Sequence, residues 1–133
     1  MDEPVPPSPG DGDRPLALVV EGDAIQRIGT ADCVAEAGFE VIEAWNGPTA
    51  LRQIERHPEL RLVVIDADLP DPDGRFALIH AIARLRPGLT LMAVSAGPAP
   101  EPGALPCDAR FAAKPLGAGV ARQARERLGG RFA

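Results

Sequence analysis

From Pro15 to the end of the chain, short apolar runs alternate with longer stretches in which apolar residues recur at helical spacing. The first run, LALVV at 16–20, has no polar position that could face water. A strand that is apolar on both faces is typical of a parallel sheet covered by helices on both sides. The alternation of strand-length and helix-length segments therefore predicts an α/β domain.

The pattern predicts five strands and four helices. The first helix is expected to begin at an Asp23 cap and to stop at Gly38. The second opens at Pro48, where a missing N–H is tolerated. The third is expected at 75–86 and the last at 117–130. The strands are expected at 16–20, 39–44, 61–66, 90–96 and 109–114.

The stretch 97–108, GPAPEPGALPCD, interrupts this alternation between the fourth and fifth strands. It contains prolines at 98, 100, 102 and 106. Each proline lacks a backbone N–H and disfavours the helical conformation of the residue before it. We therefore expect a loop, or at most one helical turn, in place of a helix.

The composition separates the ends of the chain from the domain. Residues 1–14 combine four prolines and two glycines with several acids, and Val5 is their one sizeable apolar side chain. Such a segment cannot bury enough surface to offset its ordering entropy, so 1–14 is predicted to be a disordered tail. The folded domain is then expected at 15–129, with a short C-terminal tail at 130–133.

Charge and hydropathy exclude several functional classes. The chain has 14 basic and 19 acidic residues, and a net charge of -5 argues against a surface that covers nucleic-acid phosphates. No apolar run has the length of a membrane helix, and no signal-peptide pattern opens the chain, so a cytoplasmic protein without membrane contact is expected. Cys33 and Cys107 lack the spacing of a zinc site or a disulfide framework.

Four acids lie within eight positions at the end of the third strand and after it, namely Asp66, Asp68, Asp71 and Asp73. Ligands of an open parallel sheet bind at the carboxyl ends of its strands. Glu21, Ser95 and Lys114 follow the first, fourth and fifth strands and are expected at the same edge. Carboxylates near a hydroxyl and the single lysine of the chain suit a hard divalent cation and a phosphoryl group. Asp71 and Asp73 are also expected as turn and helix-cap residues.

The chain from Leu16 to about Leu128 resembles the receiver domain of bacterial two-component response regulators. The matching motifs are LVVEGDAIQR, AGFEVIEAWNGPTAL, LVVIDADLPDPDG, MAVSAG and FAAKP, in the order and roughly the spacing of that family. The resemblance implies a flavodoxin-like fold, a doubly wound five-stranded parallel sheet of order 2-1-3-4-5. The proline-rich stretch implies that the fourth helix of this fold is lost or reduced to a loop.

The resemblance also assigns roles to individual residues. It implies that Asp66 is the phosphoacceptor, which takes a phosphoryl group from a histidine kinase or a phosphotransfer protein. The implied Mg²⁺ ligands are Glu21, Asp66 and the backbone carbonyl of Asp68, with Asp23 as a further candidate. The implied switch and charge-neutralising residues are Ser95, Phe111 and Lys114.

Gly22 departs from the family pattern, because the family places a second carboxylate there that contacts the metal directly. Loss of an outer-shell partner alone weakens metal binding by about 10- to 100-fold, so loss of a direct ligand should cost at least as much. Mg²⁺ binding is therefore expected to be weak or absent. Lys114 would then be able to pair directly with Asp66.

Three functions remain open on the sequence. The first is a stand-alone receiver, not an enzyme, that is phosphorylated on Asp66 and signals by contact with a downstream protein. The second is a pseudo-receiver, an interaction module that works without phosphorylation, which Gly22 favours. The third is a phosphatase of the haloacid-dehalogenase type, because VVIDADLP matches the DxD pattern of that class, although on the third strand and followed by Pro70.

Overall fold

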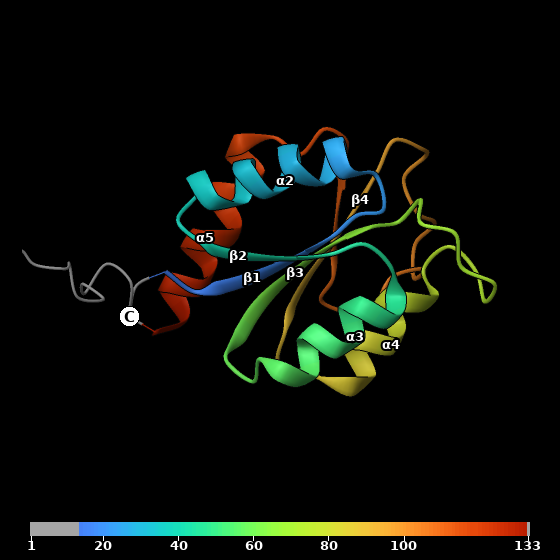
Figure 1. Ribbon diagram of the computed structural model, residues 1–133, viewed down its shortest axis with the longest axis horizontal. Coiled ribbons are helices and arrows are strands. Elements are labelled where there is room, and N and C mark those ends of the chain that lie inside the picture. The colour runs from blue at the N-terminus through green and yellow to red at the C-terminus, as the bar shows by residue number, and fades with distance from the viewer. Residues whose placement is uncertain (1–13, 133) are drawn as a thin grey trace, which may run out of the picture.

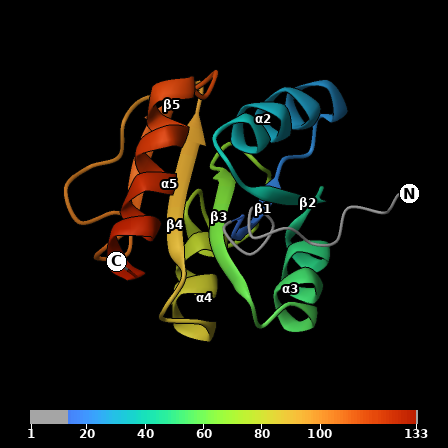
Figure 2. The ribbon, with the colours of Figure 1, turned by 90° about the vertical axis from the view of Figure 1, so that its left-hand side faces the viewer.

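The computed structural model describes residues 14–132 and shows a five-stranded parallel sheet with helices on both faces (Figure 1). The strands lie in the order β2-β1-β3-β4-β5, which is the predicted flavodoxin-like order. Figure 2, turned by 90°, shows this order from β5 across to β2. The strands are β1 (Leu16–Val20), β2 (Glu40–Ala44), β3 (Leu60–Asp66), β4 (Thr90–Ser95) and β5 (Arg110–Ala113).

The described part of the chain contains four helices, two on each face of the sheet. They are α2 (Ala24–Glu36), α3 (Gly47–Arg56), α4 (Ala77–Leu85) and α5 (Ala118–Phe132). Helices α2 and α5 cover one face, and α3 and α4 cover the other (Figure 1). The predicted fold class is therefore confirmed. The third predicted helix, 75–86, is shorter than expected and begins two residues later, at Ala77.

The core explains why β1 needs an apolar residue at every position. Leu18 and Val20 belong to the cluster beneath α3 and α4, whereas Ala17 and Val19 belong to the cluster beneath α2 and α5. Successive side chains of a strand point to opposite faces, and both faces are covered here. All five residues of β1 are buried.

Helix α2 begins and ends at the predicted residues. The Asp23 side chain accepts a hydrogen bond from the backbone N–H of Gln26 at 2.9 Å, as an N-cap residue does. Gly38 follows the helix with a φ of 110°, in the left-handed region that disfavours any side chain. A Cβ added at Gly38 would also lie 3.3 Å from the Arg125 side chain.

The chain from 97 to 109 forms a loop without any helix, as the prolines predict. The loop is nevertheless attached to the domain. A ring nitrogen of His80 on α4 lies 2.7 Å from the carbonyl oxygen of Ala104, and Leu105 packs against the core beneath α3 and α4. These contacts cover part of the surface that a helix would otherwise cover.

We expect the loop to exchange its amide hydrogens faster than the core strands do. Few backbone amides of 97–108 have hydrogen-bond partners within the loop, whereas Leu62 to Ile65 lie in the middle of the sheet with neighbours on both sides. Hydrogen exchange followed by mass spectrometry measures both regions in one experiment. Equal protection of the loop and of 62–65 would contradict this expectation.

The ends of the domain differ slightly from the boundaries expected on composition. The predicted tail at 1–14 lies outside the described residues, except for Arg14. Helix α5 continues to Phe132, beyond residue 129 at which the domain was predicted to end. None of the helices described here is both long and apolar enough to span a bilayer.

Candidate functional site

The predicted site residues meet at the carboxyl edge of the sheet, where the ends of two strands and the segments after two others contribute. Asp66 is the last residue of β3, and Ser95 is the last residue of β4. Glu21 follows β1 and Lys114 follows β5. Glu21, Asp66 and Ser95 are all buried. Four side chains from distant parts of the sequence therefore form one polar cluster.

The ammonium group of Lys114 lies at the centre of this cluster. Its Nζ is 2.8 Å from Asp66 Oδ1 and 2.9 Å from Glu21 Oε1, and it donates to Gln26 Oε1 at 3.0 Å. Burial alone would lower the pKa of Lys114, but the hydrogen bonds and charges of Asp66 and Glu21 outweigh burial and raise it. The charged lysine bridges two carboxylates, of which the sequence analysis had considered only the pairing with Asp66.

Glu21 is held by contacts on all its oxygens. One carboxylate oxygen accepts from Lys114, and the other accepts from the backbone N–H of Asp23 at 3.0 Å. Its backbone carbonyl accepts from Arg27 at 3.0 Å, and Arg27 also pairs with Glu43 on β2. Glu21 is therefore fixed in position and already satisfied by protein donors.

Asp68 points its side chain toward the end of β4. Its Oδ1 accepts from the Ser95 hydroxyl at 2.6 Å, and its Oδ2 accepts from the backbone N–H of Ala96 at 2.9 Å. Burial alone would raise the pKa of Asp68, but these hydrogen bonds and the charges of Lys114 and Arg75 outweigh burial and lower it. Only the backbone carbonyl of this residue had been assigned a role from the sequence.

Arg75 belongs to the site although the sequence analysis did not select it. Its Nη2 donates to Ser95 Oγ and to the carbonyl oxygen of Pro98, both at 2.8 Å. Its guanidinium also lies 4.7 Å from the centre of the Phe76 ring. Arg75 therefore places a second positive charge beside Ser95 and ties the loop after β4 to the segment before α4.

The side chains at this edge do not fit a Mg²⁺ ion in the arrangement observed. Gly22 offers no ligand, the Asp23 carboxylate caps α2, and the Lys114 ammonium lies between the carboxylates of Glu21 and Asp66. Within the described residues, no group of three histidine, cysteine, aspartate or glutamate side chains is placed to hold a metal ion. The lysine takes the position between two carboxylates that a cation would otherwise occupy.

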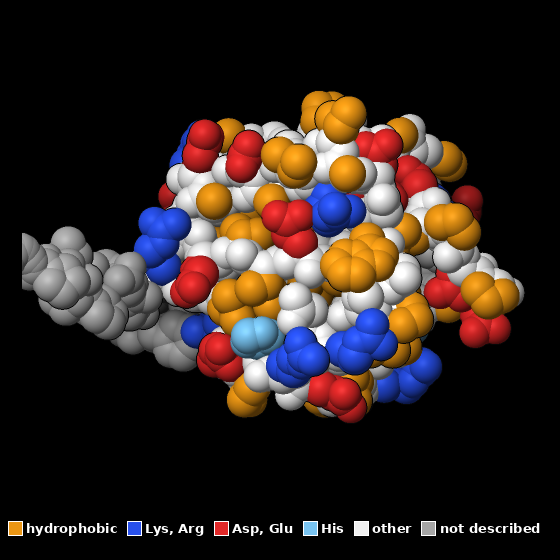
Figure 3. Space-filling view, viewed as in Figure 1, with side chains coloured by type: hydrophobic (Ala, Val, Ile, Leu, Met, Phe, Trp, Pro, Cys, Tyr) orange, Lys and Arg blue, Asp and Glu red, His pale blue; other side chains and the backbone are white. Residues whose placement is uncertain are grey.

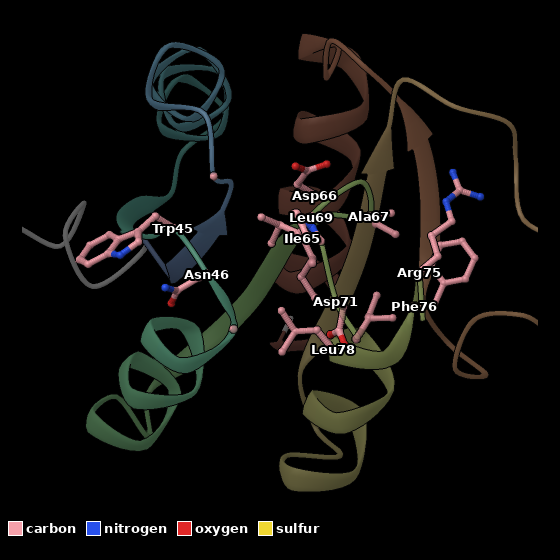
Figure 4. Close-up of a pocket in the computed structure, with 15 residues that line it drawn as sticks. Trp45, Asn46, Ile65, Asp66, Ala67, Leu69, Asp71, Arg75, Phe76 and Leu78 are labelled. Carbon is pink, nitrogen blue, oxygen red and sulfur yellow. The ribbon is translucent and has the colours of Figure 1, made fainter. Parts of the chain in front are cut away.

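A cavity of about 290 Å³ opens beside Asp66 (Figure 4). Trp45 and Asn46 line it from the β2–α3 connection, and Arg75 and Phe76 line it from the segment before α4. Trp45 is 54% exposed, although it lies next to the site. The cavity gives a group of phosphate size a path to the Asp66 carboxylate.

The remaining candidates from the sequence lie near the site but outside the charged cluster. Phe111 on β5 is half-buried and packs against the core beneath α3 and α4. Asp71 forms a turn, in which its Oδ1 accepts from the N–H of Asp73 at 2.8 Å. The predicted helix-cap role of Asp71 and Asp73 is wrong. The N-cap residue of α4 is Phe76, and no side chain makes a capping hydrogen bond at this helix start.

The surface of the domain carries charges of both signs. Figure 3 shows acidic and basic side chains interspersed over the face in view, without a large patch of one sign. Such a face lacks the continuous basic surface that nucleic-acid phosphates require.

Comparisons with solved structures show which proteins share this arrangement. A CheY-like response regulator receiver domain protein from Methanospirillum hungatei is 24% identical, with 90% of this chain and 97% of that chain covered and a TM-score of 0.73. The signal receiver domain of an HD domain-containing protein from Pseudomonas fluorescens is 22% identical, with 90% and 98% covered and a TM-score of 0.70. The chain has the receiver-domain fold.

The resemblance to receiver domains is thus confirmed at the level of the fold. Comparisons with protein-family models and with curated proteins give no match. This chain is also similar in structure to a pilus assembly-related protein from Burkholderia pseudomallei. The two are 20% identical, with a TM-score of 0.71 and with 91% of this chain and 93% of that chain covered. Because one fold serves different functions, the function has to be argued from the site.

Substitution of Gly22 by aspartate should create a Mg²⁺ site in this receiver fold. The new carboxylate would join Glu21 and Asp66, and we expect Mg²⁺ affinity to rise by about tenfold or more. The extra negative charge should also lower stability without metal. Isothermal titration calorimetry measures the affinity.

The Gly22→Asp variant requires a small shift of Leu69, because a Cβ at Gly22 would lie 3.1 Å from Leu69 Cδ2. Gly88→Asp is the matched control, since a Cβ at Gly88 meets no atom within 4 Å and the charge change is the same. Unchanged Mg²⁺ affinity in a folded Gly22→Asp protein would show that the missing carboxylate does not limit Mg²⁺ binding.

Proposed function

We propose that the protein is a response regulator receiver module that accepts a phosphoryl group on Asp66 and signals by contact with another protein. The observation that carries this proposal is the pairing of a buried Asp66 carboxylate with the Lys114 ammonium at 2.8 Å, beside a cavity large enough to admit a phosphoryl group. The pairing holds a carboxylate oxygen at the end of the central strand next to a charge that can neutralise a phosphoryl group.

The chemistry requires positioning and electrostatics more than covalent help from the protein. An oxygen of Asp66 attacks the phosphorus of a phosphohistidine, and the P–N bond breaks as the P–O bond forms. The histidine nitrogen leaves with the electron pair and takes a proton from water. Lys114 stays beside Asp66 and moves toward the added phosphoryl oxygens. The phosphoryl group then replaces one of the two carboxylate partners of the lysine.

The partners that this role requires are a histidine kinase or a phosphotransfer protein as donor and a downstream signalling protein as receiver of the signal. Both are expected to be bacterial and cytoplasmic, and the module itself acts as a phosphoprotein in a phosphorelay, not as an enzyme. Mg²⁺ is expected to bind weakly, since Gly22 provides no ligand. Direct binding to nucleic acid or to a membrane is not part of the proposal.

The proposal is tested by incubation of the purified protein with acetyl phosphate, followed by intact mass spectrometry. We expect one phosphoryl group to be added to the native protein. The reaction is run with Mg²⁺ and with a chelator, and we expect only a small difference between them. A protein that stays unlabelled under both conditions would contradict phosphorylation at Asp66.

A pseudo-receiver that works without phosphorylation is the second candidate, and one observation favours it. Lys114 already bridges Glu21 and Asp66, so an internal ammonium stands between two carboxylates where a receiver would hold a cation. In that case the protein would interact with its partner in one fixed state. The acetyl phosphate experiment distinguishes the two candidates, because only the first predicts a covalent product. The phosphatase hypothesis has no comparable support in the described residues.

A further inference from the structure

Three donor groups surround the Asp68 carboxylate. The Ser95 hydroxyl donates to Asp68 Oδ1 at 2.6 Å, the Ala96 N–H donates to Oδ2 at 2.9 Å, and Lys114 Nζ lies 4.0 Å from Oδ2. A hydroxyl, a backbone amide and an ammonium from the ends of two neighbouring strands thus converge on one carboxylate. Hydrogen bonds to an ionised acceptor are about twice as strong as neutral ones.

Arg75 and Gly97 complete the site and determine the direction of the Ser95 hydroxyl. Ser95 Oγ accepts from Arg75 Nη2 and from the Gly97 N–H, both at 2.8 Å. A hydroxyl has one proton and two acceptor positions, so both acceptor positions are filled and the proton goes to Asp68. Ser95 is fully buried, so bulk solvent does not reach these contacts.

We propose that the Asp68 carboxylate occupies the phosphoryl site that the proposed function assigns to Ser95, Ala96 and Lys114, as an internal substitute for a tetrahedral oxyanion such as a phosphoryl group or phosphate, and that Arg75 holds Ser95 in place for it. An incoming oxyanion has to displace Asp68, because the single Ser95 proton serves one acceptor at a time. Asp68 thereby sets how readily the site accepts an external anion. For a phosphoryl group carried on Asp66, the inference rests on the proposed function, whereas binding of free phosphate does not require transfer.

Asp68 is suited to leave the site, in contrast to its neighbour Asp66. The Asp68 side chain is 37% exposed and the Asp66 side chain 7%. Displaced from the site, the Asp68 carboxylate can therefore turn toward water, where its charge is hydrated. The donors would keep an anionic partner throughout, so the exchange leaves no buried donor unpaired.

Titration of ¹⁵N-labelled protein with inorganic phosphate, followed by NMR, tests this inference. We expect Asp68→Ala to bind phosphate about tenfold or more tightly than the native protein, with the largest shift at the Ala96 amide, because an occupant with two hydrogen bonds has been removed. Asp73→Ala is the matched control. It removes the same charge from an exposed position of the same segment and should change the affinity less than twofold.

Two further variants keep the test decisive. Asp68→Asn retains the size of the side chain and should show a smaller gain in the same direction if Asp68→Ala folds poorly. Arg75→Met, added to the Asp68 variant, should remove part of the gain. Equal phosphate affinity in the native protein and both Asp68 variants, or an equal gain in Asp73→Ala, would overturn the inference. Free phosphate binds without phosphorylating Asp66, so the two proposals fail separately: phosphate binding that depends on Asp68, in a protein that acetyl phosphate does not label, would refute the proposed function and leave this inference standing.

Discussion

Lys114→Met should destabilise the domain by about 3 kcal/mol at neutral pH. The substitution removes one partner of a buried pair and leaves Glu21 and Asp66 close together without a positive charge between them. Removing one partner of a buried ion pair typically costs about 3–5 kcal/mol, and the lower value is expected because one edge of this cluster reaches solvent. Urea unfolding followed by circular dichroism measures the difference in the free energy of unfolding.

The pH dependence of stability offers a second readout of the same pair. The pKa of Lys114 is raised in the folded protein, so its contribution is present below the unfolded pKa of about 10.4 and is lost as pH rises through the folded pKa. The native protein should therefore lose stability above about pH 10, and the Lys114→Met protein should lose less.

Two variants control the Lys114 prediction. Arg52→Met removes a positive charge from an exposed position of α3 and should change stability by less than about 0.5 kcal/mol. Adding Glu21→Gln to Lys114→Met should restore part of the lost stability, because it removes one of the two facing charges. A loss in Lys114→Met no larger than the loss in Arg52→Met would mean that the bridge between the carboxylates contributes little.

Asp66→Asn should abolish labelling by acetyl phosphate. An amide oxygen is a poor nucleophile, while the shape of the side chain and the contact with Lys114 are largely kept. Among the carboxylates near the cavity, Asp66 is the one that ends the central strand against the ammonium at 2.8 Å. Intact mass spectrometry after incubation measures the product.

The control for this prediction is Asp71→Asn, which changes a neighbouring carboxylate that also lines the cavity but only forms a turn. It should be labelled as the native protein is. Full labelling of Asp66→Asn would show that the phosphoryl group is attached elsewhere in the chain.

Much of the fold could be predicted because burial on two faces leaves a strong pattern. The apolar run Leu16–Val20 has no polar interruption, and it forms a fully buried strand. The prolines of 97–108 excluded a helix for reasons of backbone sterics alone, and the structure has a loop there. Convergence of Asp66 and Lys114 could also be predicted, because parallel strands bring their carboxyl ends to one edge.

The finer contacts of the site left no such pattern in the sequence. Arg75 is one of 13 arginines, and its bond to Ser95 spans 20 residues of chain that no periodicity connects. The family pattern assigned the backbone carbonyl of Asp68 to Mg²⁺ and gave its side chain no role. Side-chain direction within a loop depends on the donors that surround it, which only the folded structure places.

Reduction of the labelled protein with borohydride, followed by peptide mapping, tests phosphorylation at Asp66 most directly. Borohydride converts an aspartyl phosphate to homoserine and leaves free aspartate unchanged, so the position of the phosphoryl group becomes a stable mass change. A receiver that works through Asp66 predicts homoserine at position 66 and unchanged aspartate at positions 68, 71 and 73. Unmodified Asp66 in protein exposed to acetyl phosphate, or homoserine at another position, would contradict it.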